Sequence, residues 1–533
     1  MELPTAHHKI GVPIRLRIVQ AQMSHKRKIL QGSASNIARL LLSMLVALVL
    51  PPLLVHRMVP AEYSAWVLIL QCGAYINLLD LGLQTAIGKF VAEYDAIGDR
   101  LGSSRILSNS FAILCASAFV GAIVIAVIAW RVPQIFHQMP SALIGPLREG
   151  ILVVGWSTVL ALPFSAFLAA FTGLQKYGFP TALAMASKVF SSAALAVLLL
   201  MHGRLLQLAW LMAAFTLATA GSQFFGWRHY AKEHVDFSFK LVDRQSAWRL
   251  LKYCSALSVW TVAFLLISGL DIVIVGHYDY KDTGYYSIAG SITNFMLLVI
   301  ASVFGPLLPA VSSVQSNRTS EQIGEMVIKA TRYCALLICM IGLPLLLGAY
   351  PLLKLWVGHD YAIHSTLFLE VLVLGNAIRQ LSGPYALVVV ATGKQHLATI
   401  SGIAEAVVNV CLSIYLVQKI GAVGVAVGTL VGAFVGVGVH FFVSMKLTRS
   451  TAFIPRRRLI VEGVLRPLLC VIPSILLLPF WRRLAMLPLS PPLIVIWTLA
   501  TLGTVWLTGL TSAERHDLKG AALRLVYSQR ASG

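Results

Sequence analysis

The chain contains fourteen segments of about twenty mostly apolar residues, and this series limits its possible folds more than any other feature. A helix needs roughly 20 apolar residues to cross a hydrocarbon core about 30 Å thick. Of the 533 residues, 58% are hydrophobic and only 12% are charged, which excludes a soluble enzyme, a secreted disulfide scaffold and a disordered chain. The segments lie near residues 37–56, 63–88, 106–130, 150–171, 179–201, 206–227, 253–276, 285–313, 333–353, 365–391, 397–417, 423–445, 462–481 and 491–511. The sequence therefore predicts an all-α polytopic membrane protein with about 14 transmembrane helices.

The distribution of basic residues predicts the orientation of these helices. With the amino terminus placed inside, the inside segments carry 31 Lys and Arg residues and the outside segments carry nine. Cytoplasmic loops of membrane proteins collect Lys and Arg, so both termini are expected in the cytoplasm. The net charge of +21 is then mostly a consequence of topology, and nucleic acid is not an expected partner.

An internal repeat divides the chain. Tyr63-Ser64 opens the second apolar segment, and Tyr286-Ser287 opens the eighth. At nearly the same offset, Thr172-Gly173 follows the fourth segment and Thr392-Gly393 follows the tenth. Two parallel six-helix repeats plus a C-terminal helix pair are therefore expected, related by an axis along the membrane normal. The expected units are a basic cytoplasmic tail (1–32), an N-terminal bundle (33–228), a cytoplasmic linker (229–252), a C-terminal bundle (253–446), helices 13 and 14 (447–512) and a cytoplasmic tail (513–533).

The amino terminus leaves one question open. Met23 precedes the basic run from Ser24 to Lys28 and resembles a translation start, so the sequence does not decide whether residues 1–22 are translated. The basic tail that precedes the first apolar segment lacks the apolar core of a secretory signal peptide.

Several local motifs carry a family resemblance. Leu79-Asp80-Leu81-Gly82-Leu83 is followed by Lys89-Phe90-Val91-Ala92-Glu93-Tyr94, and Gly269-Leu270-Asp271 is followed by Gly284-Tyr285-Tyr286-Ser287. Together with the turn at Gly393-Lys394, these motifs resemble polysaccharide-transporter flippases, a family of the superfamily that exports drugs, oligosaccharidyl lipids and polysaccharides. The likeness covers about residues 30–450.

The resemblance implies a function. A member of this family flips an undecaprenyl-pyrophosphate-linked oligosaccharide from the inner to the outer leaflet of the bacterial inner membrane. It does so by alternating access, for O-antigen and lipopolysaccharide or for exopolysaccharide biosynthesis. The implied partners are the lipid-linked oligosaccharide, membrane lipids, and polysaccharide polymerase and chain-length proteins. Two alternatives stay open, a cation-coupled multidrug antiporter and a lipid II flippase of the same superfamily.

The first group of candidate cavity residues lies in the second segment. Asn77, Asp80 and Gln84 are spaced i, i+3 and i+7, which places them within about 60° on one face of a continuous helix. Ionisable groups in a membrane are rare and usually functional, so this stripe is expected to line the cavity or to bond a neighbouring helix.

Two basic residues fall inside predicted helices. Lys188 lies about nine residues into the fifth segment, and its side chain either faces the cavity or extends to the membrane surface. Arg379 shares a face with Asn376 and precedes Gly383-Pro384, which should break the helix. Because broken helices often mark transporter binding sites, Arg379 is a candidate contact for a substrate phosphate. The alternative is a buried ion pair with Glu405 or Asp271.

The remaining candidates belong to the C-terminal bundle. Glu405 and Asn409 share a face of the eleventh segment, and the offset of the repeat places Lys188 opposite position 408. Opposite charges at corresponding positions suit either a pair across the cavity or a cation site. Asp271 lies in the outer third of the seventh segment, where a structural role is expected more than a role in transport.

No motif for catalysis or cofactor binding is found. Gly82 to Lys89 has the wrong spacing for a phosphate-binding loop, and Phe90 replaces the required Ser or Thr. The seven cysteines lie in apolar segments without metal-site or disulfide spacing. The chain is therefore expected to be a non-enzymatic carrier without cofactor or metal, driven by membrane potential or an ion gradient.

Overall fold

A computed structural model describes residues 41–304, 319–392 and 395–470, and isolated positions at 492, 495–496, 499–500, 503–509 and 515. Among them, ten helices are long and apolar enough to cross a membrane, and two shorter apolar helices cover Leu41–Arg57 and Leu265–Tyr278. These twelve helices match the first twelve predicted spans, and the chain is a multi-pass α-helical membrane protein. Parts of the predicted spans 462–481 and 491–511, the end of span 285–313, the predicted tail 1–32 and all but Arg515 of the tail 513–533 lie outside the described residues.

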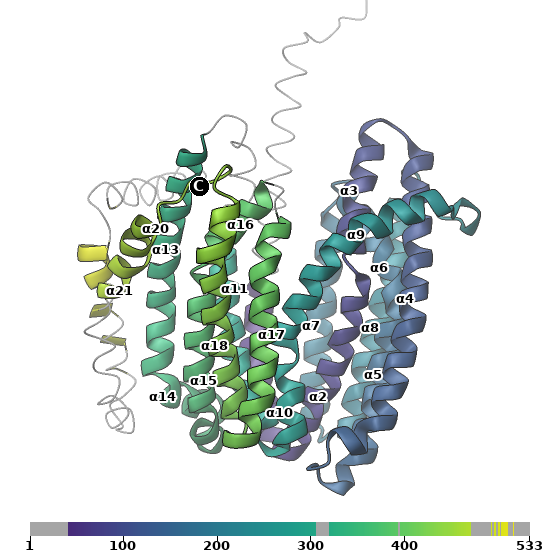
Figure 1. The fold of residues 1–533 in the computed structure, drawn as a ribbon. Helices are drawn as coiled ribbons and strands as arrows, with labels where there is room; N and C mark the ends of the chain where they lie inside the picture. The colour runs from purple at the N-terminus through teal and green to yellow at the C-terminus, as the bar shows by residue number, and fades with distance from the viewer. Residues whose placement is uncertain are drawn as a thin grey trace, which may run out of the picture.

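The N-terminal half forms one bundle, drawn from purple to blue in Figure 1. Its elements are the helix Leu41–Arg57, α2 (Pro60–Ile76), η1 (Asn77–Asp80), α3 (Leu83–Ala96), α4 (Arg100–Ile135), α5 (Ser141–Ala161), η2 (Leu162–Phe164), α6 (Ser165–Gly173), α7 (Gly178–Leu200) and α8 (Leu205–Tyr230).

The C-terminal half forms the second bundle, drawn from teal to green (Figure 1). It contains η4 (Leu265–Gly269), α10 (Asp271–Tyr278), η5 (Tyr280–Asp282), α11 (Thr283–Phe304), α13 (Ser320–Leu347), α14 (Ala349–Val357), α15 (His359–Gln380), α16 (Gly383–Ala391), α17 (Gln395–Ile420), α18 (Val423–Val439), η7 (His440–Ser444) and α19 (Met445–Leu447). Beyond it lie α20 (Arg456–Arg458), η8 (Leu459–Leu465) and α21 (Arg466–Leu469), of which η8 and α21 pack on α13, and η9 (Val505–Gly509).

The connection between the halves contains the beginning of a helix. Helix α9 (Arg244–Phe264) begins nine residues before the predicted span at 253 and runs obliquely from the N-terminal bundle toward α10 (Figure 1). The segment before α9 is fastened to α4, because Ser104, Ser108 and Asn109 accept backbone N–H groups from residues 236, 238 and 243. The first turns of α9 therefore belong with the N-terminal bundle.

The fourth helix of each half breaks at a corresponding position. Between α5 and α6 the break is the 3₁₀ turn η2, which contains Pro163. Between α15 and α16 it falls at Leu381 and Ser382, just before Gly383-Pro384, as the sequence predicts. The separation of Pro163 from Pro384 in the sequence agrees with the offset of the internal repeat.

Close packing of α17 on α18 depends on a run of glycines. Gly424, Gly428, Gly432 and Gly436 recur at every fourth position of α18 and therefore share a face. A Cβ atom on Gly432 would stand 2.9 Å from Asn409 Cβ, and one on Gly436 would stand 2.5 Å from Glu405 Oε2. Small residues allow helix backbones to approach closely in membranes. The run thus fixes the position of the polar face of α17.

Candidate functional site

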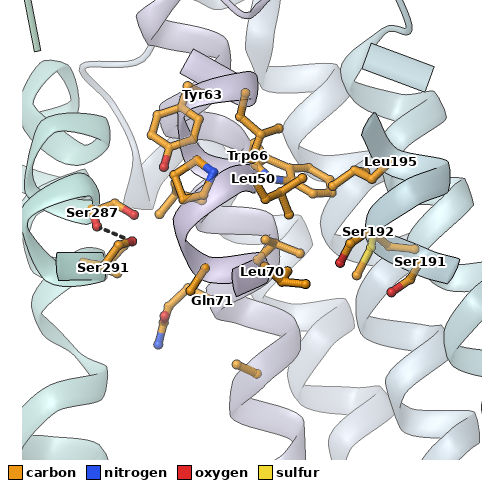
Figure 2. A pocket seen from close by; sticks show the side chains of 18 of the residues that line it. Leu50, Tyr63, Trp66, Leu70, Gln71, Ser191, Ser192, Leu195, Ser287 and Ser291 are labelled. Carbon is orange, nitrogen blue, oxygen red and sulfur yellow. Dashed lines mark hydrogen bonds between the residues drawn. The ribbon is translucent and has the colours of Figure 1, made fainter. Parts of the chain in front are cut away.

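A cavity of about 410 Å³ lies between the two halves. Its walls come from the helix Leu41–Arg57, α2, α7 and α8 of the N-terminal half, and from α10 and α11 of the C-terminal half. Figure 2 shows side chains of α2 at its centre, with Ser287 and Ser291 of α11 on one side and Ser191 and Ser192 of α7 on the other. We call this space the central cavity.

The lining of the central cavity is divided between apolar and polar groups. Val46, Ala47, Leu50, Pro51 and Leu54 form an apolar wall from the first helix. The polar groups are the side chains of Tyr63, Gln71, Lys188, Ser191, Ser192, Ser287 and Ser291. Hydroxyl and amide groups both donate and accept hydrogen bonds, as do the hydroxyls of a saccharide.

Lys188 is the charged residue of this lining. It lies ten residues after the start of α7, its side chain is exposed, and it forms no ion pair with another described residue. An unpaired ammonium group in a membrane protein is expensive unless it reaches water or an anion. Within the part of the chain that the structure describes, the central cavity therefore offers a negative ligand one positive charge that no carboxylate neutralises.

Arg379 is held inside the C-terminal half instead. Its Nε donates to Glu405 Oε1 at 2.5 Å, and Nη1 donates to Asn376 Oδ1 at 2.6 Å. Glu405 and Asn376 are buried. The structure thus brings three predicted site residues together. Arg379 and Glu405 form the buried ion pair that was the alternative to a phosphate contact, and Asn376 accepts a further hydrogen bond. The remaining Nη2 of Arg379 is buried without a partner among the described residues.

A second polar network joins four elements of the C-terminal half. Asp271 Oδ2 accepts hydrogen bonds from the hydroxyls of Tyr286 at 3.0 Å and Thr429 at 2.9 Å. Asn409 donates to the carbonyl of Ile267 at 2.6 Å, where η4 departs from α-helical hydrogen bonding. Asp271 and Asn409, both buried, thus tie α10, α11, α17 and α18 around this break.

The predicted stripe of Asn77, Asp80 and Gln84 is not one helical face, and that expectation was wrong. Helix α2 ends at Ile76, η1 follows, and Leu81 and Gly82 adopt left-handed conformations with φ of 53° and 77° before α3 begins. Asn77 and Gln84 are exposed. Asp80 accepts the Gln84 N–H through Oδ2 at 3.4 Å, and its Oδ1 is buried without a hydrogen-bond partner among the described residues.

The two halves meet tightly at one end of the central cavity. The hydroxyl of Ser64 accepts the N–H of Gly284 at 3.0 Å, and the hydroxyl of Tyr280 donates to the carbonyl of Ala61 at 2.8 Å. The rings of Tyr63 and Tyr361 pack edge to face with centroids 6.1 Å apart. These contacts lie where α2 begins and where α10 joins α11, which is the predicted outer side. The cavity is therefore closed at its predicted outer end.

Most polar residues of the central cavity were missed by sequence reasoning. Ser191 and Ser192 follow Lys188 by one turn, and Ser287 belongs to the repeated Tyr-Ser motif, so both signals were present in the sequence. Single serine hydroxyls satisfy their own helix carbonyls, as Ser291 does with Ser287 O, and so carry no mark of function in a sequence.

Comparisons with known proteins agree with this architecture. The profile of a family described as polysaccharide biosynthesis proteins matches residues 61–365, which is more than half of the chain. A probable low-salt glycan biosynthesis flippase, Agl15 of Haloferax volcanii, is 23% identical over 241 residues, which are 43% of this chain and 50% of that protein. The match spans only half the length of that relative.

Two solved structures share the fold. A structure of the lipid II flippase MurJ in an inward closed conformation superposes with a TM-score of 0.67 at 13% identity, covering 92% of this chain and 99% of that one. An inward-facing multidrug resistance MATE family transporter of the MOP superfamily superposes with a TM-score of 0.60 at 14% identity, covering 78% and 96%.

Proposed function

The chain belongs to the polysaccharide biosynthesis protein family, and on that premise we propose that it moves a lipid-linked saccharide across the membrane. The proposed substrate is an undecaprenyl-pyrophosphate-linked oligosaccharide, passed from the inner to the outer leaflet for O-antigen or exopolysaccharide assembly. The observation that carries the proposal is Lys188, a cation with no ion-pair partner among the described residues, in a cavity to which both halves contribute.

The central cavity suits the head group of such a lipid. Lys188 supplies a positive charge for a phosphate, the serine, glutamine and tyrosine side chains supply hydrogen bonds for sugar hydroxyls, and the wall of helix Leu41–Arg57 is apolar. A phosphate at mid-membrane would otherwise lack a counter-ion, so Lys188 lowers the energy of the head group during passage.

The arrangement also supports alternating access. The closing contacts at the predicted outer end join different halves, whereas the Arg379–Glu405 pair and the Asp271 network lie within the C-terminal half. Contacts within a half can persist while contacts between halves break. We propose that the described conformation is open toward the cytoplasm and that rocking of the two bundles opens the outer end.

Membrane potential is sufficient to drive this transport. A pyrophosphate diester carries two negative charges, and each is worth roughly 2.3 kcal/mol per 100 mV of inside-negative potential. The total of roughly 4.6 kcal/mol per 100 mV favours outward movement by more than about a thousandfold if the charges cross the whole field. We propose transport powered by the potential or an ion gradient, without ATP hydrolysis by this chain.

Flipping in sealed proteoliposomes tests the proposal. The purified protein should flip a lipid-linked oligosaccharide when a potential is imposed in the absence of nucleotide. Lys188→Ala should lower the maximal rate, Lys188→Arg should retain most of it, and Lys419→Ala, which removes a lysine outside the cavity lining, should leave it unchanged. Transport that requires ATP, or that is indifferent to Lys188, would refute the proposal.

The same assay separates the two alternatives. A lipid II flippase would flip lipid II in preference to the oligosaccharide lipid. A multidrug antiporter would move organic cations against a proton or sodium gradient and leave both lipids in place. Lys188 argues against a cation as cargo, because like charges repel at short range in a membrane.

A further inference from the structure

A second hollow lies beside α9, where this helix packs on the chain from α2 to α3. The chain from α2 to α3 packs beside α9 and η4 through four side-chain contacts. In chain order, Gln71 donates to Gly269 O of η4, Ser258 of α9 donates to Leu81 O, the rings of Phe90 and Tyr253 pack together, and Arg249 donates to Tyr94 Oη. Because one set of numbers rises as the other falls, the pair is antiparallel. Gln71 lines the central cavity, and Leu81 lies ten residues, roughly 15 Å, further toward the predicted cytoplasmic side.

The hollow has a volume of about 520 Å³ and is lined by Leu81, Trp248, Leu251, Lys252, Cys254, Ser255 and Ser258. We call it the α9 hollow. Lys252 is the charged residue of this lining.

One face of α9 opens onto the hollow. Trp248, Leu251, Lys252 and Ser255 are spaced i, i+3, i+4 and i+7, so they share that face, and all four are exposed. Trp248 is 69% exposed. The opposite side of α9 is buried against the N-terminal bundle, where Leu250 is inaccessible and Tyr253 packs on Phe90. The exposed face therefore has no partner among the described residues and joins a cation to large apolar groups.

This combination fits a phosphate ester carried on a lipid. The ammonium group of Lys252 supplies charge, and the hydroxyls of Ser255 and Ser258, now bonded to carbonyls of Lys252 and Cys254, can rotate to donate to phosphate oxygens. Trp248 and Leu251 supply an apolar rim for the lipid chain. A free, fully hydrated anion would gain nothing from that rim.

We propose that the α9 hollow is an entry site, where the diphosphate of the lipid-linked substrate binds at the cytoplasmic face before it reaches Lys188. The inference rests on the proposed function. Its position supports it, because the hollow lies between the basic start of α9 at Arg244 and the level of Gln71 in the central cavity. Lys252 and Lys188 place positive charges at two successive depths, so the head group can leave the first while it approaches the second.

Binding to the purified full-length protein tests the entry site. The probe is undecaprenyl diphosphate, titrated into phosphatidylcholine nanodiscs that hold wild type, Lys252→Ala, Lys252→Arg or the control Lys240→Ala, which removes an exposed lysine from the linker outside the hollow. We expect Lys252→Ala to weaken binding about tenfold, and Lys252→Arg and Lys240→Ala to bind like wild type. In the flipping assay, Lys252→Ala should raise the half-saturating substrate concentration while Lys188→Ala lowers the maximal rate.

Three results would overturn the inference. Unchanged affinity of Lys252→Ala would show that the hollow does not bind the diphosphate. Equal weakening for phosphatidylglycerol, measured in parallel, would identify the hollow as a general phospholipid contact. Failure of wild type to bind undecaprenyl diphosphate would refute the proposed function as well as the entry site. A defect in Lys188→Ala but not in Lys252→Ala would refute the entry site and leave the proposed function supported.

Discussion

Ser64 and Gly284 join the two halves of the protein through a single hydrogen bond, in which the backbone N–H of Gly284 donates to Ser64 Oγ at 3.0 Å. The same hydroxyl donates to the carbonyl of Pro60 at 3.0 Å, so it is fixed in position at the start of α2. Ser64 belongs to one copy of the repeated Tyr-Ser motif, and Gly284 stands just before the other copy. The motif that marks the repeat in the sequence thus lies at the closed end of the cavity.

Widening this contact should open the closed end. A Cβ at position 284 would stand 3.0 Å from Tyr63 Cδ1 and 3.1 Å from Ser64 Oγ, so the larger side chain of Gly284→Val forces α2 and α11 apart. We expect longer distances between spin labels placed at Gln138 and Leu355, exposed positions on opposite halves at this end, in a variant without native cysteines. Gly290→Val on α11, where a Cβ meets no atom within 4 Å, is the matched control. Identical distance distributions would contradict the assignment.

Loss of one partner of the Arg379–Glu405 ion pair should destabilise the protein more than loss of both. Removing one partner of a buried ion pair leaves an uncompensated charge and typically destabilises by about 3–5 kcal/mol. We therefore expect Arg379→Met and Glu405→Met each to lower the thermal unfolding temperature in detergent, and the double variant to recover most of the loss. If the recovered double variant does not transport, the pair also serves transport, and Arg379 Nη2, which has no hydrogen-bond partner among the described residues, is the candidate contact for substrate.

The glycines of α18 should tolerate substitution only where no atom of α17 lies close to the new side chain. A Cβ on Gly428 would stand 2.8 Å from the backbone nitrogen of Ser413, which cannot move aside as a side chain can. Gly428→Ala should destabilise the protein by about 1–3 kcal/mol, the usual effect of overpacking. Gly438→Ala, in the same helix with no atom within 4 Å of the new Cβ, should be neutral or stabilising. Equal unfolding temperatures for the two variants would contradict the packing described.

The attachment of the linker to α4 should depend on pH. The Ser246 N–H and the Asn109 amide donate to the Asp243 carboxylate, and these hydrogen bonds, with nearby Arg105, lower its pKa from 3.8. Because the pKa of Asp243 is lower in the folded than in the unfolded protein, its carboxylate stabilises the folded linker fully above pH 3.8. This stabilisation is lost as the pH falls through the lowered pKa. Hydrogen exchange of linker amides, corrected for intrinsic rates, should therefore show protection at neutral pH that declines below about pH 4.

Variants identify the group responsible. Asp243→Ala should lose this protection already at neutral pH, whereas Asp95→Ala, which removes an exposed carboxylate outside the linker, should keep it. Protection in Asp243→Ala equal to that of wild type would show that the backbone N–H bonds to Ser104, Ser108 and Asn109 hold the linker without the carboxylate.

Part of the site could be predicted from the sequence because the relevant physics is local. For Lys188, at depth in an apolar segment, the cost of an ammonium group in hydrocarbon left two positions, a cavity or the membrane surface, and the structure places it in the lining of the central cavity. Gly383-Pro384 implied the break between α15 and α16, because proline cannot continue the hydrogen bonding of a helix. For Arg379 the sequence supplied two possibilities, and the structure shows that it pairs with Glu405 across α15 and α17.

The sequence by itself determined that this is an α-helical membrane protein built from a repeat. Hydrocarbon excludes any span whose backbone groups are not bonded internally, so length and apolarity decide the class of fold without reference to neighbours. Only the tertiary structure decided which polar groups face one another. The left-handed turn at Leu81 and Gly82 places Asp80 and Gln84 in different helices, and Ser191 and Ser287 line one cavity from helices of different halves. Such contacts depend on how the bundles pack, which the period of a single helix does not specify.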